Sequence, residues 1–135
     1  MIDEFKFHHI GIVVRSIEDY LKHSIFSQNI QDPVYDPLQD SNIVLIETDK
    51  ALFIELIEPV TSEATTYDFL HRSGKSSIFH HTCFEVPNKD FVDNICKKLS
   101  IKIFWGPHPA VLFDGKDIMF GYNKNQEIIE FLLTE

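Results

Sequence analysis

The tripeptide Phe-His-His occurs twice in this chain of 135 residues, at positions 7–9 and at positions 79–81. The two copies lie 72 positions apart, although the whole sequence holds only seven histidines. Each copy opens an apolar run that leads to a helix-capping residue, Ser16 in the first half and Asn88 in the second. A repeat of this kind indicates two similar modules in one chain.

A second pair of matching segments lies towards the end of each module. Residues 53–57 and 128–132 are apolar except for a central glutamate, which is Glu55 in the first segment and Glu130 in the second, 75 positions later. A carboxylate inside an apolar strand is costly to bury unless it is hydrogen-bonded, neutralised or bound to a cation. Two such glutamates at equivalent places call for one shared explanation.

The two repeats together predict a site for one divalent metal ion, with four ligands: His9, Glu55, His81 and Glu130. Two neutral imidazoles and two carboxylates suit Zn, Co, Ni, Mn or Fe and leave coordination positions for water or substrate. Any one of these residues alone would more often be an ordinary strand residue, but that explanation must hold at four symmetric positions at once. Because strand side chains alternate, His8 and His80 are expected on the opposite faces.

Hydrophobic periodicity predicts the order β-α-β-β-β in each half. In the first half we expect a helix opened by Ser16, a turn at 48–50, and strands at 5–14, 42–47 and 52–58. In the second half we expect a helix after Asn88 and strands at 78–86, 102–105, 118–122 and 127–133. A short helix at 67–71, ending near Gly74, connects the halves. We therefore expect one domain over residues 1–135, with module one at about 5–60, a connector at about 61–76 and module two at about 77–135.

Composition limits the classes of partner. The chain has 21 acidic and 12 basic residues and a formal charge of -9, which would repel nucleic acid and anionic membrane surfaces. Its apolar runs are only strand length and its first residues lack the plan of a signal peptide, so we expect a cytoplasmic protein with no membrane segment. Cys83 and Cys96 are expected to be reduced residues of the interior.

Duplicated modules with histidine on the first strand and glutamate on the last resemble the vicinal-oxygen-chelate (glyoxalase, bleomycin resistance and dioxygenase) superfamily over essentially the whole chain. Within it, the sequences at 8–14 (HHIGIVV), 54–59 (IELIEP) and 80–86 (HHTCFEV), with Phe69-Leu70 before Gly74, look most like methylmalonyl-CoA epimerase. This resemblance implies an α+β fold whose modules pair into a cupped, half-barrel mixed β-sheet with helices outside. It also implies the same four metal ligands as the repeat.

The resemblance implies an epimerase or isomerase that removes a proton next to a carbonyl group, with a metal-stabilised enolate, on a small molecule such as an acyl-CoA thioester. Glu130 is the first candidate for the base, Glu55 is its counterpart across the substrate, and Glu47 is a third candidate. Coenzyme A phosphates would need cations, for which Arg15, Arg72 and Lys75 are candidates. Alternatives on the same scaffold are a glyoxalase-type lyase of a thiol adduct, an iron dioxygenase and a non-enzymatic, resistance-type binding protein. We also expect a homodimer.

Overall fold

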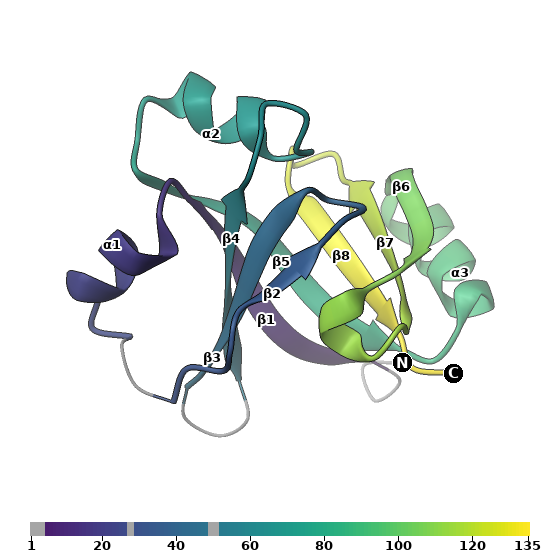
Figure 1. Cartoon of the computed structure of the whole chain (residues 1–135). Helices are drawn as coiled ribbons and strands as arrows, with labels where there is room; N and C mark the ends of the chain where they lie inside the picture. Colours follow the sequence, from purple (N-terminus) through teal and green to yellow (C-terminus); the bar gives the residue numbers. More distant parts are fainter. Residues whose placement is uncertain (1–4, 27–28, 49–51) are drawn as a thin grey trace. The chain divides into compact units, whose positions relative to one another are not determined.

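The computed structural model describes residues 5–26, 29–48 and 52–135 (Figure 1). Its helices are α1 (Ile17–Lys22), α2 (Tyr67–Ser73), α3 (Lys89–Leu99) and the 3-10 helix η3 (Val111–Phe113). Its strands are β1 (Lys6–Val14), β2 (Val34–Asp36), β3 (Ser41–Glu47), β4 (Phe53–Pro59), β5 (Ser77–Val86), β6 (Lys102–Pro109), β7 (Asp117–Tyr122) and β8 (Ile128–Leu133). No helix in the described part of the chain is long and apolar enough to cross a membrane. The turn predicted at 48–50 lies largely outside the described residues.

Eight strands form one mixed sheet, hydrogen-bonded in the order β2-β3-β4-β1-β5-β8-β7-β6. Each module uses the same internal order, since β2-β3-β4-β1 in the first corresponds to β6-β7-β8-β5 in the second. β5 and β8 run parallel, whereas β3 with β4 and β7 with β8 run antiparallel. The α+β fold class and the β-α-β-β-β order expected for both modules are therefore confirmed.

The chain divides into two compact units, and the division falls at the two Phe-His-His triplets. One unit is Ile10–His80, and the other combines Met1–His9 with His81–Glu135. Both β1 and β5 are therefore shared between the units, because each strand continues through its triplet. The boundary between the two units therefore falls within these two strands and not in the connector between the modules.

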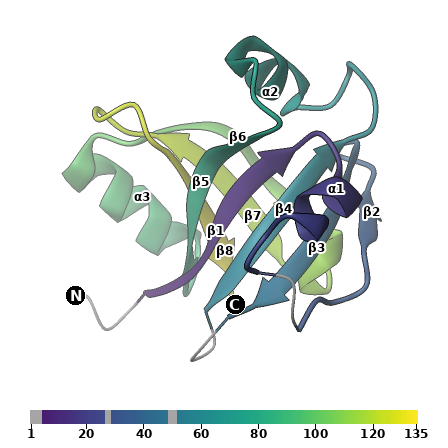
Figure 2. The same ribbon diagram turned by 90° about the vertical axis from the view of Figure 1, so that its left-hand side faces the viewer.

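In the unit of residues 10–80, α1 covers the sheet formed by β3 and β4 (Figure 2). Ser16 caps this helix as predicted, because its hydroxyl oxygen accepts a hydrogen bond from the amide of Asp19 at 3.1 Å. Ile17 packs into a core with Leu56 and other apolar residues of the two strands. The helix ends at Lys22, so Ile25, which continues the helical spacing in the sequence, lies outside it and is 91% exposed.

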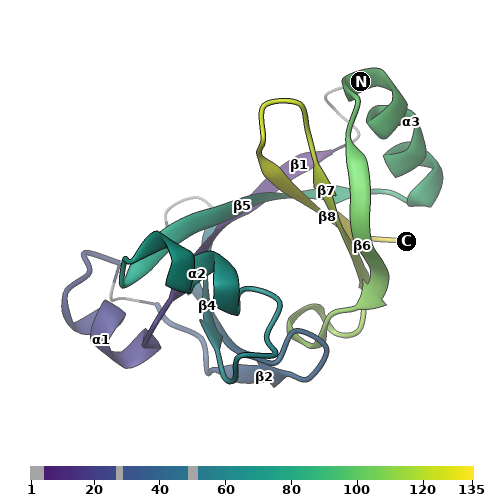
Figure 3. The ribbon, with the colours of Figure 1, turned by 90° about the horizontal axis from the view of Figure 1, so that it is seen from above.

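In the unit that contains residues 81–135, α3 packs on one face of β5, β7 and β8 (Figure 3). Asn88 caps this helix as predicted, by accepting a hydrogen bond from the amide of Phe91 at 3.0 Å. Phe131 and Leu133 face the helix, whereas Leu132 belongs to a separate apolar cluster with Cys83 and Phe120. Because strand side chains alternate, this second cluster lies on the face that also receives His81 and Glu130.

Candidate metal centre

Two neighbouring parallel strands place the second module's predicted ligands on one face of the sheet. The register of β5 and β8 pairs Cys83 with Glu130, and His81 precedes Cys83 by two positions on β5. Residues two apart in a strand point the same way, so His81 and Glu130 share a face. His9, on the first half of β1, belongs to the same compact unit.

The side chains of His9, His81 and Glu130 meet at three atoms, which we call the ligand triangle: Nε2 of His9, Nε2 of His81 and Oε1 of Glu130. The two Nε2 atoms are 3.1 Å apart. Glu130 Oε1 lies 3.1 Å from His9 Nε2 and 2.9 Å from His81 Nε2. The side chains of both histidines are fully buried and that of Glu130 is 2% exposed.

Hydrogen bonds among these three atoms cannot account for all three short distances. An imidazole nitrogen carries at most one hydrogen, which lies in the ring plane and points at one partner, and an ionised carboxylate only accepts. A cation, in contrast, attracts the lone pairs of all three atoms at once. Ligand atoms about 2.1 Å from one metal ion and at right angles to one another lie about 3.0 Å apart. The triangle therefore fits one divalent transition-metal ion.

Aromatic rings surround the ligand triangle within its own unit. Phe113, carried by η3, stacks on His9 with ring centres 5.9 Å apart. Phe120 meets His81 edge-on at 5.3 Å and belongs to the buried apolar cluster on that face. The three side chains of the triangle are buried, and electrostatic interactions are stronger in a buried, apolar environment than in water.

Glu55, the fourth predicted ligand, lies in the unit of residues 10–80. It is opposite Leu45 in the β3–β4 ladder and its exposed fraction is 5%. A carboxylate buried to this extent needs hydrogen-bond donors or a cation. Glu55 is therefore buried, as a ligand inside an apolar strand would be. In contrast, Glu47, the third candidate for the base, lies exposed at the end of β3.

Two residues, His8 and Cys83, were not expected to lie at the site. His8 was expected on the opposite face of its strand, but its Nδ1 lies 2.7 Å from Nδ1 of His9. Strand alternation fixes only the direction of the Cα–Cβ bond, and the imidazole of His8 turns back to meet His9 and the edge of Phe113. The fully buried thiol of Cys83 lies close enough to His8 and His9 for the three to form a possible metal-binding group. The position of Cys83, two residues after His81 in the sequence, was the signal that could have placed it at the site. Cys83 and Cys96 are both in the reduced state, as predicted.

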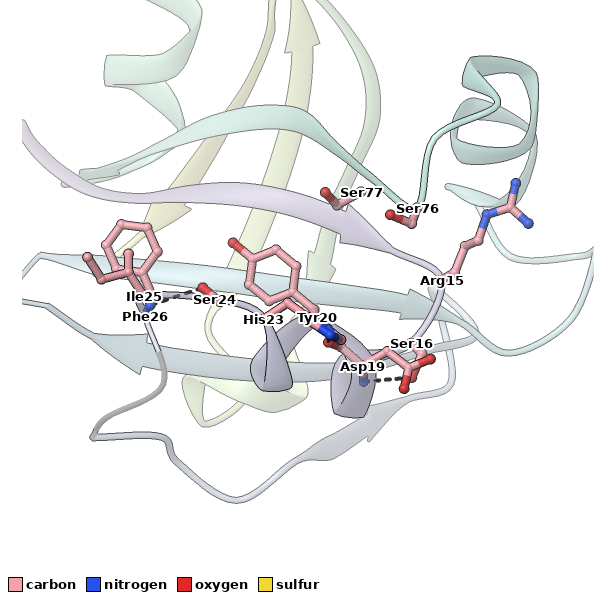
Figure 4. Close-up of a pocket in the computed structure, with 10 residues that line it drawn as sticks. All are labelled: Arg15, Ser16, Asp19, Tyr20, His23, Ser24, Ile25, Phe26, Ser76 and Ser77. Atoms are coloured by element: carbon pink, nitrogen blue, oxygen red, sulfur yellow. Dashed lines mark hydrogen bonds between the residues drawn. The ribbon is translucent and has the colours of Figure 1, made fainter.

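A separate cavity of about 570 Å³ lies in the unit of residues 10–80 (Figure 4). Its lining includes Arg15, Tyr20 and His23, together with the hydroxyl groups of Ser76 and Ser77. The guanidinium of Arg15 is anchored through Nε, which donates a hydrogen bond to the carbonyl oxygen of Lys75 at 3.1 Å. Of the cations considered for coenzyme A phosphates, Arg15 lines this cavity.

The fold is shared with solved structures. A hypothetical protein from Bacillus halodurans superposes with a TM-score of 0.80 at 24% identity, over 97% of this chain and 95% of that one. The methylmalonyl-CoA epimerase of Mycobacterium tuberculosis gives 0.75 at 17% identity, over 96% and 87% of the two chains. A Streptomyces coelicolor methylmalonyl-CoA epimerase variant in complex with 2-nitronate-propionyl-CoA gives 0.72 at 17% identity, over 95% and 96%. No protein-family model and no curated protein matches the chain. The fold implied by the sequence resemblance is confirmed.

Proposed function

We propose that this chain is a divalent-metal-dependent epimerase or isomerase that moves a proton on the carbon next to the carbonyl group of an acyl thioester. The ligand triangle of His9, His81 and Glu130 carries this proposal, because it combines a metal site with a carboxylate that can accept a proton. The shared fold supports a coenzyme A thioester as substrate. One of the epimerase structures is a complex with methylmalonyl-CoA, and another is a complex with 2-nitronate-propionyl-CoA.

His9, His81 and Glu130 would hold the ion, and we propose Glu55 as the fourth ligand. The support for Glu55 is its burial and its place in the repeat, which matches that of Glu130. Two neutral imidazoles and two carboxylates balance the charge of a divalent ion and suit Zn, Co, Ni, Mn or Fe. When bound, such an ion supplies a Lewis acid for the carbonyl oxygen of the substrate.

Glu130 is the proposed base. Its carboxylate accepts the proton from the substrate carbon, and the electron pair of that C–H bond moves towards the carbonyl group. Return of a proton to the opposite face of the same carbon inverts its configuration, and we assign this step to Glu55 in its protonated form. After turnover Glu130 gives its proton to solvent and Glu55 takes one up, so both groups return to their starting states. No atom is gained or lost, so the reaction needs no further reactant.

We propose that Arg15 binds a phosphate of the coenzyme A group at the cavity of Figure 4. A guanidinium pairs with two phosphate oxygens at once. Arg15→Gln is then expected to raise KM for an acyl-CoA by about tenfold and leave kcat unchanged. An acyl-pantetheine thioester, which lacks the nucleotide, serves as the matched control, and its KM should stay the same. An equal change with both substrates would remove Arg15 from this role.

The proposed function is tested by incubating metal-loaded and metal-free protein with methylmalonyl-CoA in deuterated water. Metal-loaded protein should place deuterium on the carbon between the two carbonyl groups and interconvert the two epimers, and metal-free protein should do neither. Absence of exchange with methylmalonyl-CoA and with other acyl thioesters would contradict the proposal. Consumption of a thiol adduct of an α-ketoaldehyde, or of oxygen with iron present, would then indicate the lyase or the dioxygenase. Binding without turnover would indicate a binding protein.

A further inference from the structure

His8 occupies a position between the ligand triangle and a carboxylate. One ring nitrogen of His8, Nδ1, lies 2.7 Å from Nδ1 of His9. The other, Nε2, faces Oε1 of Glu85 at 3.8 Å. His8 and Glu85 have side-chain exposures of 12% and 37%, so the far end of this row borders solvent while His9 is fully buried. The three side chains form a row from the surface to the triangle, all within one compact unit.

The contact between the two Nδ1 atoms determines where the hydrogens of both rings lie. His9 contributes Nε2 to the ligand triangle, and a neutral imidazole that offers a lone pair at Nε2 carries its hydrogen on Nδ1. That N–H can donate only to an acceptor, so Nδ1 of His8 must hold a lone pair. His8 then carries its own hydrogen on Nε2, which faces the carboxylate of Glu85. A negative charge at that place favours this arrangement.

Phe113 fixes the position of both rings. Its ring meets His8 edge-on at 5.4 Å and stacks on His9 at 5.9 Å. The two imidazoles also meet nearly at right angles, with an interplanar angle of 79°. A ring held in this way can turn little, so the hydrogen bond between the Nδ1 atoms retains its direction.

The second triplet gives an internal comparison. His80 stands next to His81 as His8 stands next to His9, in an identical tripeptide. Its ring packs edge-on against Phe69 of α2, with centres 4.8 Å apart, within the unit of residues 10–80. The two identical triplets therefore place their first histidines, His8 and His80, against different neighbours. His80 is the matched control for His8.

We propose that His8 is a positioning residue for the metal site: it accepts the Nδ1 hydrogen of His9 and so keeps Nε2 of His9 available to a metal ion, with Glu85 holding His8 in the required tautomer. This inference rests on the metal site of the proposed function, but it does not depend on which reaction the protein catalyses. Groups that orient a metal-bound histidine in this way typically change metal affinity by about 10- to 100-fold when they are removed.

The test is the affinity of four variants for Zn²⁺, measured by competition with a chromophoric chelator, beside the wild type. His8→Phe keeps a ring but loses the acceptor and should weaken binding by about 10- to 100-fold. His8→Asn presents a carbonyl oxygen near the former Nδ1 and should recover most of this loss. Glu85→Gln should weaken binding by a few-fold, and His80→Phe should leave it unchanged.

A second measurement needs no metal. Long-range ¹H–¹⁵N spectra of the imidazoles should show His9 with its hydrogen on Nδ1 in the wild type and in His8→Asn, and a mixture of tautomers in His8→Phe. Wild-type affinity in His8→Phe, or an equal loss in His80→Phe, would overturn the proposal. So would a wild-type protein that binds no Zn²⁺, whereas a protein that binds Zn²⁺ without epimerase activity would contradict only the proposed reaction. If His8→Phe does not fold, His8→Asn and Glu85→Gln decide by the same measurements.

Discussion

The two modules of this chain are nearly symmetric in sequence and unequal in structure. Each supplies one histidine and one glutamate at equivalent strand positions, which predicts two similar contributions to one site. In the structure, His9 falls into the compact unit of the second module's His81 and Glu130, whereas Glu55 lies in the other unit. A sequence repeat thus identifies equivalent residues, but it does not establish that they have equal roles. Four predictions measure how unequal they are.

The largest effect is expected from the two histidines, which should behave alike. His9→Ala and His81→Ala each remove one corner of the ligand triangle and should leave less than about a tenth of an equivalent of metal per chain. Elemental analysis after metal supplementation and gel filtration measures this, with the exposed His108→Ala as control. Full metal content in either variant would show that the substituted histidine is not a ligand and that the two histidines do not have equivalent roles.

The two glutamates should separate ligand from base. Glu130→Gln keeps an amide oxygen that can coordinate but cannot accept a proton, so deuterium exchange into the substrate should fall by about a hundredfold or more while most of the metal stays. In Glu55→Gln, exchange by Glu130 should persist for one epimer, but inversion should be lost. Mass spectrometry and chiral analysis of the same samples distinguish these results. Equal exchange in wild type and Glu130→Gln would move the base to Glu55 or to Glu47.

A smaller difference is expected between the helices. In α3, of 11 residues, Asn88 accepts the hydrogen bond of Phe91, and Asn88→Ala should lower the free energy of unfolding by about 1 kcal/mol. In α1, of six residues, the hydrogen bond from the Asp19 amide to Ser16 is exposed to solvent, so water can replace it, and Glu58 Oε2 separately accepts the hydrogen bond of the Ile17 amide at 3.0 Å. Ser16→Ala should therefore cost only about 0.5 kcal/mol. Chemical denaturation measures both, and a larger loss in Ser16→Ala would reverse the order.

The smallest effect concerns a carboxylate of the first module. Asp40 accepts hydrogen bonds from the hydroxyl groups of Thr61 and Tyr35, which hold its pKa below the ordinary value of 3.8. A lowered pKa in the folded state stabilises the fold above that ordinary value, and the stabilisation is lost as the pH falls through the folded-state pKa. Asp40→Asn tolerates the positive φ of 48° and should lower Tm near pH 6 by more than it does at pH 3. A difference in Tm that does not change with pH would contradict this.

Much of the fold could be predicted from the sequence because its signals are local. Capping side chains fix the beginnings of helices through contacts within a few residues, as at Ser16 and Asn88. A glycine in the left-handed conformation fixes the end of a helix in the same local way, as at Gly74 with φ 69°. The four predicted ligands are buried, and they could be selected because an apolar strand with one polar residue in its interior gives a clear pattern. The cytoplasmic location and the homodimer stay predictions.

What could not be predicted depends on distant partners. The order β-α-β-β-β was expected for the first module, but only three of its strands could be placed in the sequence. The remaining strand, β2, has three residues between Pro33 and Pro37, too few for a pattern, and it forms because it pairs with β3. Strand β6 continues beyond the predicted residue 105 to Pro109 because its pairing with β7 resumes after an irregularity. The rotation of the His8 ring likewise depends on His9 and Phe113, to which strand periodicity is insensitive.

The ligand triangle joins the beginning, the middle and the end of the chain, which has a consequence for folding rates. His9 and His81 are 72 positions apart, and Glu130 lies on the last strand. Contacts over such separations require loop closure before they contribute any stability, so they form late. An ion bound to them would stabilise the native state more than the transition state and would slow unfolding without accelerating folding. The supply of metal would then set the lifetime of the folded protein and leave the time needed to fold unchanged.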